Sequence, residues 1–210
     1  MMDPELDLSV LDREVDIVMH GGQPPFSRPA GLGHLGRDSV FTEPYMIRSP
    51  HRVFVGDEVR VLAGASLSLV EEYGEERFEP ELHIGDGVII GTDLLLHCTG
   101  RIDIGNRVAI ATRVYIGDSF RDYEDPTVPP RQMPMSDPEP IKICDDVFIG
   151  AGSAIQPGVT IGERAMVSVN SVVTRDGPPR TVVLGNPARI VRSWDDEAGR
   201  WVAGPLRRPS

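Results

Sequence analysis

The most constraining feature of this sequence is a six-residue period that runs from Ile143 to Thr174. An aliphatic residue opens each block of six, and a small or β-branched residue stands four positions later. The openers are Ile143, Ile149, Ile155, Ile161, Val167 and Val173, and the later residues are Val147, Ser153, Val159, Ala165 and Ser171. Neither the period of an α-helix nor simple strand alternation gives this spacing, so it indicates a solenoid built of hexapeptides. We expect each opener to point into the core of a three-sided coil, with three blocks to a turn.

The same spacing occurs earlier in the chain, with two interruptions. The earlier openers are Val55, Val61 and Leu67, then Ile84, Ile90 and Leu96, then Ile104, Ile110 and Ile116. An acidic insertion at 71–81 and a proline-rich break from Asp118 to Lys142 separate these groups. A loop of that length inside a compact domain is usually functional or disordered, and its prolines favour a function. We therefore predict an all-β coil domain over residues 53–192, with a long loop at 119–142.

Both ends of the chain lack the recognised repeat. We predict that residues 1–52 form an irregular cap or arm over the open first coil, with a short amphipathic helix from Leu6 to Val18. We predict that residues 193–210 form a short C-terminal tail. Trp194 and Trp201 are seven positions apart, which favours a short helix packed on the coil.

Composition excludes several classes of partner. The formal net charge of −11 argues against nucleic acid and anionic membrane surfaces, which favour basic proteins. No apolar run approaches the length of a membrane span, and the acidic N-terminus lacks a signal peptide's pattern, so we expect a cytoplasmic protein. Cys98 and Cys144 show no metal-ligand spacing, so we expect two free thiols and no metal site.

The stretch IKICDDVFIGAGSAIQPGVTIGERAMVSVNSVVTRDGPPRTVVLGNPARIVR resembles the hexapeptide-repeat acyltransferases, such as the galactoside, maltose and O-antigen acetyltransferases. The resemblance extends over residues 53–192. It implies a left-handed parallel β-helix that assembles as a homotrimer, with acetyl-CoA bound in the groove between two subunits. A small-molecule acceptor would then bind at the same subunit interface, walled in by the long loop.

The resemblance also implies roles for residues of the long loop. The family's loop often begins Asp-x-x-His-x-Tyr-Glu-Asp-Pro, and that His is the general base. Here the corresponding stretch runs from Asp118 to Pro126, and Arg121 stands at the position of the His. A guanidinium group stays protonated and cannot accept the proton. We therefore assign Arg121 and Tyr123 to substrate binding, since Arg121 suits an anionic ligand.

The family's acetyl-CoA positions correspond to five residues of this chain. They are Ala151, Thr174, Arg175, Arg189 and Arg192. Clustered arginines suit the nucleotide phosphates, because each guanidinium group donates two hydrogen bonds at once. The alternative is that these arginines only cap the coil and keep its end soluble. The family's Gly-Ala-Gly-Ser is here Ser168-Val169-Asn170-Ser171, and the bulkier Val169 and Asn170 could narrow the path of the pantetheine arm.

Counting along the repeat suggests another base. Residues that follow the openers of the third face should stack in one column, and they are Ser68, His97, Gly117, Gln156 and Thr174. His97 then lies one coil from Gly117, at the root of the long loop. We assign His97 as a displaced general base, oriented by Asp118. The alternatives are an ordinary surface or interface histidine, or a histidine of the N-terminal arm that reaches a neighbouring groove.

Three hypotheses for function follow. The first is an acyl-CoA-dependent O- or N-acyltransferase that acts on a sugar or small metabolite, with acetyl as the expected acyl group. The second is a divergent relative without acetyl transfer, either a non-catalytic binding protein or an enzyme with a different reaction. The third is a structural scaffold. We favour the first, since the arginines and most of the loop motif are retained, while the replaced base leaves the second open.

Overall fold

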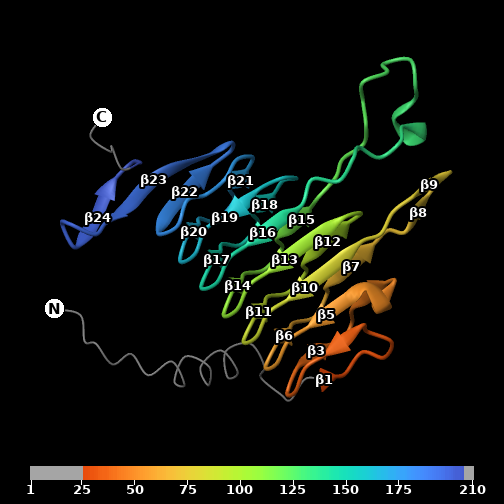
Figure 1. The fold of residues 1–210 in the computed structure, drawn as a ribbon, viewed down its shortest axis with the longest axis horizontal. Helices are drawn as coiled ribbons and strands as arrows, with labels where there is room; N and C mark the ends of the chain where they lie inside the picture. The colour runs from red at the N-terminus through yellow and green to blue at the C-terminus, as the bar shows by residue number, and fades with distance from the viewer. Residues whose placement is uncertain (1–25, 206–210) are drawn as a thin grey trace.

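The computed structural model describes residues 26–205, which form a parallel β-helix (Figure 1). The predicted helix from Leu6 to Val18 and the last residues of the tail lie outside this range. Three sheets run along the coil, and each turn contributes one short strand to each sheet. The prediction of a left-handed β-helix is confirmed.

The first sheet contains ten strands, which continue past the coil into the C-terminal tail. Its strands, in spatial order, are β1 (Phe26–Ser27), β3 (Val40–Thr42), β6 (Arg60–Val61), β11 (Ile89–Ile90), β14 (Ala109–Ile110), β17 (Phe148–Ile149), β20 (Met166–Val167), β22 (Thr181–Gly185), β23 (Ala188–Asp195) and β24 (Arg200–Ala203). The pairs from β3 to β22 are parallel, and the pairs at both ends of the sheet are antiparallel.

The second and third sheets have six strands each, all parallel to their neighbours. The second sheet contains β19 (Thr160–Ile161), β16 (Ile141–Ile143), β13 (Arg101–Ile104), β10 (Glu81–Ile84), β5 (Val53–Val55) and β2 (His34–Leu35). The third sheet contains β21 (Val172–Val173), β18 (Ala154–Ile155), β15 (Tyr115–Gly117), β12 (Leu95–Cys98), β7 (Ser66–Leu69) and β4 (Met46–Arg48). Two short 3-10 helices, η1 (Pro50–Arg52) and η2 (Pro130–Gln132), and the hairpin of β8 (Glu72–Tyr73) and β9 (Glu76–Arg77) complete the described elements.

The predicted openers form the core and pair with one another from coil to coil. Ile84 lies opposite Val55 in the second sheet, and Ile90 lies opposite Val61 in the first. Ile149 and Ile155 are fully buried. Because neighbouring coils are about 4.8 Å apart in the hydrogen-bonding direction, each ring of openers is covered by the next. The six-residue period therefore describes the interior correctly.

The coil begins earlier in the chain than residue 53. His34–Leu35, Val40–Thr42 and Met46–Arg48 pair in parallel with the three strands of the next turn. Leu35, Phe41 and Ile47 are also six residues apart, which is the signal that could have revealed this turn. Phe41 is fully buried and fills the end of the core, where an aromatic ring replaces the usual aliphatic residue. The antiparallel strand β1 then pairs with β3 at this end of the first sheet.

The prediction of a helix in the C-terminal tail is wrong. Trp194 lies in β23 and Trp201 in β24, and the two residues are cross-strand partners with ring centroids 5.8 Å apart. The edge of the first sheet offers unpaired backbone groups after β22, and an antiparallel hairpin satisfies them. Figure 1 shows these strands continuing the sheet at the C-terminal end of the coil.

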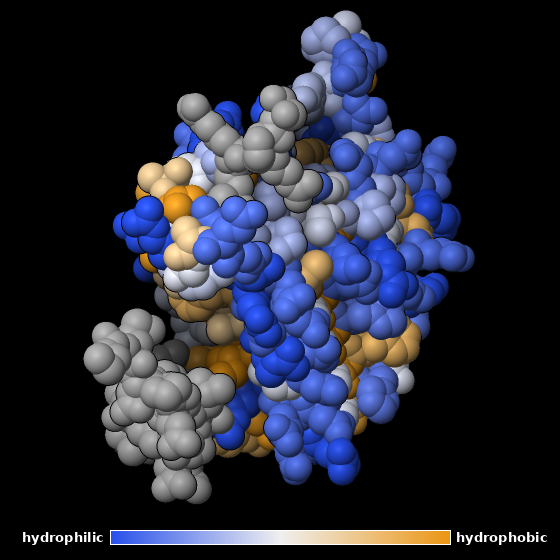
Figure 2. Space-filling view, turned by 60° about the vertical axis from the view of Figure 1, so that its left-hand side comes forward, coloured by the Kyte–Doolittle hydropathy of each residue, from blue (hydrophilic) through white to orange (hydrophobic). Residues whose placement is uncertain are grey.

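Hydrophilic residues cover most of the face drawn in Figure 2, and the orange residues form narrower areas between them. The described part of the chain contains no helix with the length and hydrophobicity that a membrane span requires. It also contains no group of three or more histidine, cysteine, aspartate or glutamate side chains that could hold a metal ion. Cys98 and Cys144 are free thiols, as predicted.

Candidate functional site

The outer face of the third sheet holds the column of residues that the repeat predicts. Arg48 pairs with Ser68, Ser68 with His97, and His97 with Gly117 in successive coils. The chain leaves the coil directly after Gly117 and enters the long loop. The Asp118 N–H donates to the His97 carbonyl at 3.3 Å, so His97 lies beside the root of this loop.

His97 is half-buried, and its Nε2 atom has no hydrogen-bond partner among residues 26–205. Burial is the main cause that lowers the pKa of His97 below its ordinary value, and Arg121 and Arg48 lower it further. The negative charge of Asp118 opposes this shift of the pKa. The imidazole is therefore neutral near pH 7 and keeps a lone pair that can accept a proton.

Asp118 is fully buried, and its carboxylate binds the corner of the preceding coil. It accepts hydrogen bonds from the Thr99 N–H at 2.9 Å, the Gly100 N–H at 2.8 Å, the Thr99 hydroxyl and the Cys98 thiol. Burial and the Asp118 charge raise the pKa of the Cys98 thiol, so the thiol stays a donor. Within the part of the chain that the structure describes, the Asp118 carboxylate forms no hydrogen bond with His97. Asp118 thus anchors the loop and acts on His97 through its charge.

The long loop has an ordered, antiparallel base. The Ser136 N–H donates to the Phe120 carbonyl at 2.9 Å, and the Asp122 N–H donates to the Pro134 carbonyl at 2.9 Å. Arg121 forms a β-bridge with Met135 between these two hydrogen bonds. Beyond this base the loop extends away from the coil (Figure 1).

Arg121 and Tyr123, the predicted substrate-binding residues, have different surroundings. The Arg121 guanidinium group lies 4.1 Å from the centroid of the Tyr73 ring and donates to the Met133 carbonyl at 3.2 Å. Tyr123 is 73% exposed and projects from the loop. Sequence reasoning missed Tyr73, because an aromatic residue in an acidic insertion carries no signal for a partner far along the chain.

Tyr115 lies across Gly117 and adds a phenol to this face. A Cβ atom at residue 117 would stand 2.3 Å from the Tyr115 hydroxyl and 2.7 Å from its Cζ atom. Only glycine leaves room for the ring in this position. Burial, with a smaller effect of Asp118, raises the pKa of Tyr115, so the phenol remains a hydrogen-bond donor beside the His97 column.

Three of the predicted acetyl-CoA residues are the arginines Arg175, Arg189 and Arg192, near the C-terminal end of the coil. Arg175 and Arg189 line one cavity of about 360 Å³ together with the apolar side chains of Val183 and Ile190. Arg192 is exposed on β23 and is not among the residues that line this cavity. The structure therefore brings together two of the three arginines.

The other predicted cofactor positions lie at corners of the coil. Thr174 directly follows β21, and Ala151 lies in the turn after β17, where its carbonyl accepts the Asn170 N–H at 2.9 Å. Asn170 has a φ of 54°, a left-handed conformation that asparagine tolerates. Its Oδ1 atom lies against Gly152 of the preceding coil, 2.3 Å from where a Cβ atom would stand. Val169 is 58% exposed, and Asn170 is exposed as well, so both departures lie on the surface of the coil.

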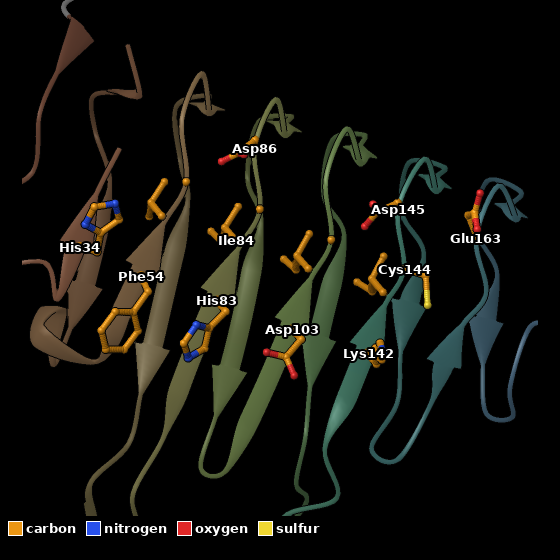
Figure 3. A pocket seen from close by; sticks show the side chains of 16 residues that line it. His34, Phe54, His83, Ile84, Asp86, Asp103, Lys142, Cys144, Asp145 and Glu163 are labelled. Carbon is orange, nitrogen blue, oxygen red and sulfur yellow. The ribbon is translucent and has the colours of Figure 1, made fainter. Parts of the chain in front are cut away.

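A second groove, of about 580 Å³, runs along the outer face of the second sheet (Figure 3). His34, Phe54, His83, Asp103 and Lys142 come from successive strands along one side of it. The Phe54 and His83 rings are stacked, with centroids 4.7 Å apart. Acidic side chains at the neighbouring corner line its other side, and they are Asp86, Asp145 and Glu163.

Comparisons with known proteins agree with this architecture. The family model described as bacterial transferase hexapeptide (six repeats) matches residues 140–175. The chain is similar to "Probable acetyltransferase Rv3034c" of Mycobacterium tuberculosis, with 27% identity over 206 residues that cover 85% of this chain and 68% of the relative. Two further relatives match at higher identity over a smaller share of their own length. The chain spans 28% and 34% of the length of two curated acetyltransferases to which it is 47% and 32% identical.

Solved structures share the fold along most of the chain. The N-acyltransferase AntD from Bacillus cereus, in complex with dTDP and 3-hydroxybutyryl-CoA, has a TM-score of 0.69 at 21% identity, covering 84% of this chain and 93% of AntD. The hexapeptide-repeat containing acetyltransferase VCA0836 from Vibrio cholerae has a TM-score of 0.55 at 27% identity, covering 92% of this chain and 84% of VCA0836.

Proposed function

Since the chain belongs to the hexapeptide-repeat acyltransferase superfamily, we propose that it transfers an acyl group from acyl-CoA to a small molecule. The observation that carries this proposal is the likeness to VCA0836 over 92% of the chain, because VCA0836 has also been solved in complex with acetyl-CoA. We take acetyl-CoA as the donor, and a hydroxyl or amine of a sugar or other small metabolite as the acceptor.

The reaction needs one base and correct positioning, because the thioester is already activated. We assign His97 as the base: its neutral imidazole accepts the acceptor's O–H or N–H proton as that oxygen or nitrogen bonds to the thioester carbon. The C–S bond then breaks, and the imidazolium returns the proton to the leaving CoA thiolate. The Nε2 atom is covered in the single chain, so acceptor binding must displace the side chains that cover it.

Arg175 and Arg189 are the proposed ligands of the CoA phosphates, because both line the cavity at the C-terminal end. Guanidinium groups form charge-assisted, bidentate hydrogen bonds with phosphate oxygens. The roles of Ala151, Thr174 and Arg192 in the same binding site remain proposals from the resemblance. Tyr123, exposed on the loop, is proposed to contact the acceptor or a neighbouring subunit.

A homotrimer is part of this proposal. The core of the coil is filled by the openers, so a ligand must bind on the outside, where a second copy would supply the missing wall of a groove. The loop extends from the coil and is suited to reach such a neighbour (Figure 1). Light scattering coupled to size-exclusion chromatography tests the trimer, and a monomeric mass would refute it. Acyl-CoA is a cytoplasmic metabolite, so the proposed reaction is compatible with a cytoplasmic protein.

The test of function combines a binding and a turnover measurement. Calorimetry measures the binding of acetyl-CoA, and a thiol-detecting assay measures CoA release with a panel of sugars and amines. We expect His97→Gln to abolish release while acetyl-CoA still binds. His83→Gln, a histidine of the second sheet, is the matched control and should leave release unchanged.

Failure to bind acetyl-CoA would overturn the proposed function. Binding without release for any acceptor would instead favour the non-catalytic relative. In that case Arg121→His, which restores the family's residue, tests whether the ancestral reaction has been lost.

A further inference from the structure

The β8–β9 hairpin contacts the long loop, although the two segments are far apart in the sequence. The Tyr73 hydroxyl donates to the Arg131 carbonyl at 3.2 Å, across 58 positions of the chain. The Met135 N–H donates to the Glu76 carboxylate at 3.0 Å. Both insertions leave the coil at the same corner, after strands of the third sheet, and Figure 1 shows both extending from that side of the coil.

Arg121 links this contact to the base of the loop. Its guanidinium group covers the Tyr73 ring at 4.1 Å and donates to the Met133 carbonyl. A cation over an aromatic face and a charged hydrogen bond both stabilise this arrangement. Arg121 therefore joins three segments: the hairpin, the outgoing strand of the loop and the returning strand of the loop.

The base of the loop is in turn attached to the coil beside His97. The Asp118 carboxylate binds the corner of the preceding coil, and the Glu139 N–H donates to the Asp118 carbonyl at 2.8 Å. The loop is thus held at its root by Asp118 and at its middle by Tyr73, Glu76 and Arg121. A segment held at two separate levels has few conformations left to it.

We propose that Tyr73, Glu76 and Arg121 form a brace that holds the long loop, which the structure places between β15 and β16 at residues 118–140, as a preformed wall of the acceptor site. Arg121 is then a positioning residue: its side chain reaches Tyr73 and the Met133 carbonyl. The effect on the acceptor rests on the proposed function, but the brace itself does not. Preorganisation of this kind lowers the entropy lost when a ligand binds.

Hydrogen exchange of the full-length protein tests the brace without any acceptor. We expect Tyr73→Leu and Arg121→Gln to accelerate exchange of the loop amides, Met135 above all, by about tenfold, the size expected for losing a cation–π contact and a hydrogen bond together. Amides of the coil should not change. Tyr73→Phe keeps the ring under Arg121 and should give a smaller increase.

Arg77→Gln is the matched control. Among residues 26–205, the Arg77 side chain pairs with Glu72 and donates to the backbone carbonyls of Gly74 and Glu76, all within the hairpin, and it leaves the Glu76 carboxylate to Met135. In this variant, the loop amides should exchange at the rate of the wild type. Unchanged loop exchange in both Tyr73→Leu and Arg121→Gln would overturn the brace. The brace would also be refuted if loop exchange rose as much in Arg77→Gln as in the other two variants, or if the coil amides exchanged faster by the same factor. Either result would indicate a general loss of stability.

Kinetics test the consequence for the acceptor. With an acceptor from the CoA-release panel, we expect Tyr73→Leu to raise the KM for the acceptor about tenfold, as for loss of preorganised binding, with the KM for acetyl-CoA unchanged. Tyr73→Phe should recover most of this loss. A loosened loop with an unchanged acceptor KM would refute the positioning role. If the wild type transfers no acyl group, the proposed function fails while hydrogen exchange still decides the brace.

Discussion

Replacing Asp118 by alanine should detach the root of the long loop from the coil. The carboxylate accepts two backbone N–H groups, of Thr99 and Gly100, along with the Thr99 hydroxyl and the Cys98 thiol. Thr99 is only 1% exposed, so water cannot replace the lost acceptor at its N–H group. Alanine would also leave a space at the position of the carboxylate.

The magnitude follows from the donors left without a partner. Each buried donor without an acceptor costs about 1–3 kcal/mol. Removing a buried charge relieves part of its desolvation cost, which offsets some of this loss. We expect a decrease of about 3 kcal/mol in the free energy of unfolding. For a chain of this size, that corresponds to a decrease of about 6–12 °C in Tm.

Differential scanning calorimetry measures the effect, with two further variants for comparison. Asp118→Asn keeps one acceptor oxygen and should lie between the wild type and Asp118→Ala. Asp137→Ala removes an exposed carboxylate of the same loop and should change the free energy of unfolding by less than about 0.5 kcal/mol. If Asp118→Ala has the same Tm as Asp137→Ala, the Asp118 carboxylate contributes nothing to stability and the reasoning is refuted.

Three other predictions test the core, the base and the cofactor site. Ile149→Ala should lower the free energy of unfolding by about 2–5 kcal/mol, because the Ile149 side chain is fully buried between coils. Urea titrations measure this loss, and a value under about 1 kcal/mol would contradict the packing. Because the folded-state pKa of His97 lies below 6.5, its ordinary value, the unfolded chain takes up this proton first. The free energy of unfolding should therefore fall as pH decreases below 6.5, and the rate of CoA release should fall over the same range. His97→Gln should remove the contribution of His97 to this fall in stability. Arg189→Gln should weaken acetyl-CoA binding about tenfold in calorimetry, while Arg180→Gln, which loses a pair with Asp196, should not.

The six-residue period was sufficient to predict the coil and its core. A residue that recurs once per side of a triangular turn must occupy the same radial position in each side, so Ile84, Ile149 and Val173 all point inward. The same count placed His97 between Ser68 and Gly117, because parallel strands in register stack equivalent positions. These are properties of local spacing, and the sequence contains them.

The spacing of residues alone could not predict contacts between segments that lie apart in the sequence. The interval between Trp194 and Trp201 fits two helical turns as well as a hairpin, and the open edge of the first sheet decides between them. The turn through Leu35, Phe41 and Ile47 kept the period, but Phe41 is aromatic where the later openers are aliphatic.

The loop shows the same division between sequence and tertiary structure. The resemblance of the loop motif implies that Arg121 stands at the position of the family's base, and the chemistry of a guanidinium group excludes that role. What Arg121 does instead depends on Tyr73, which only the folded chain brings to within 4.1 Å of it. A hexapeptide repeat specifies where its own residues lie, because each coil repeats one geometry. Insertions between the repeats obey no such period, so their contacts are decided by the fold.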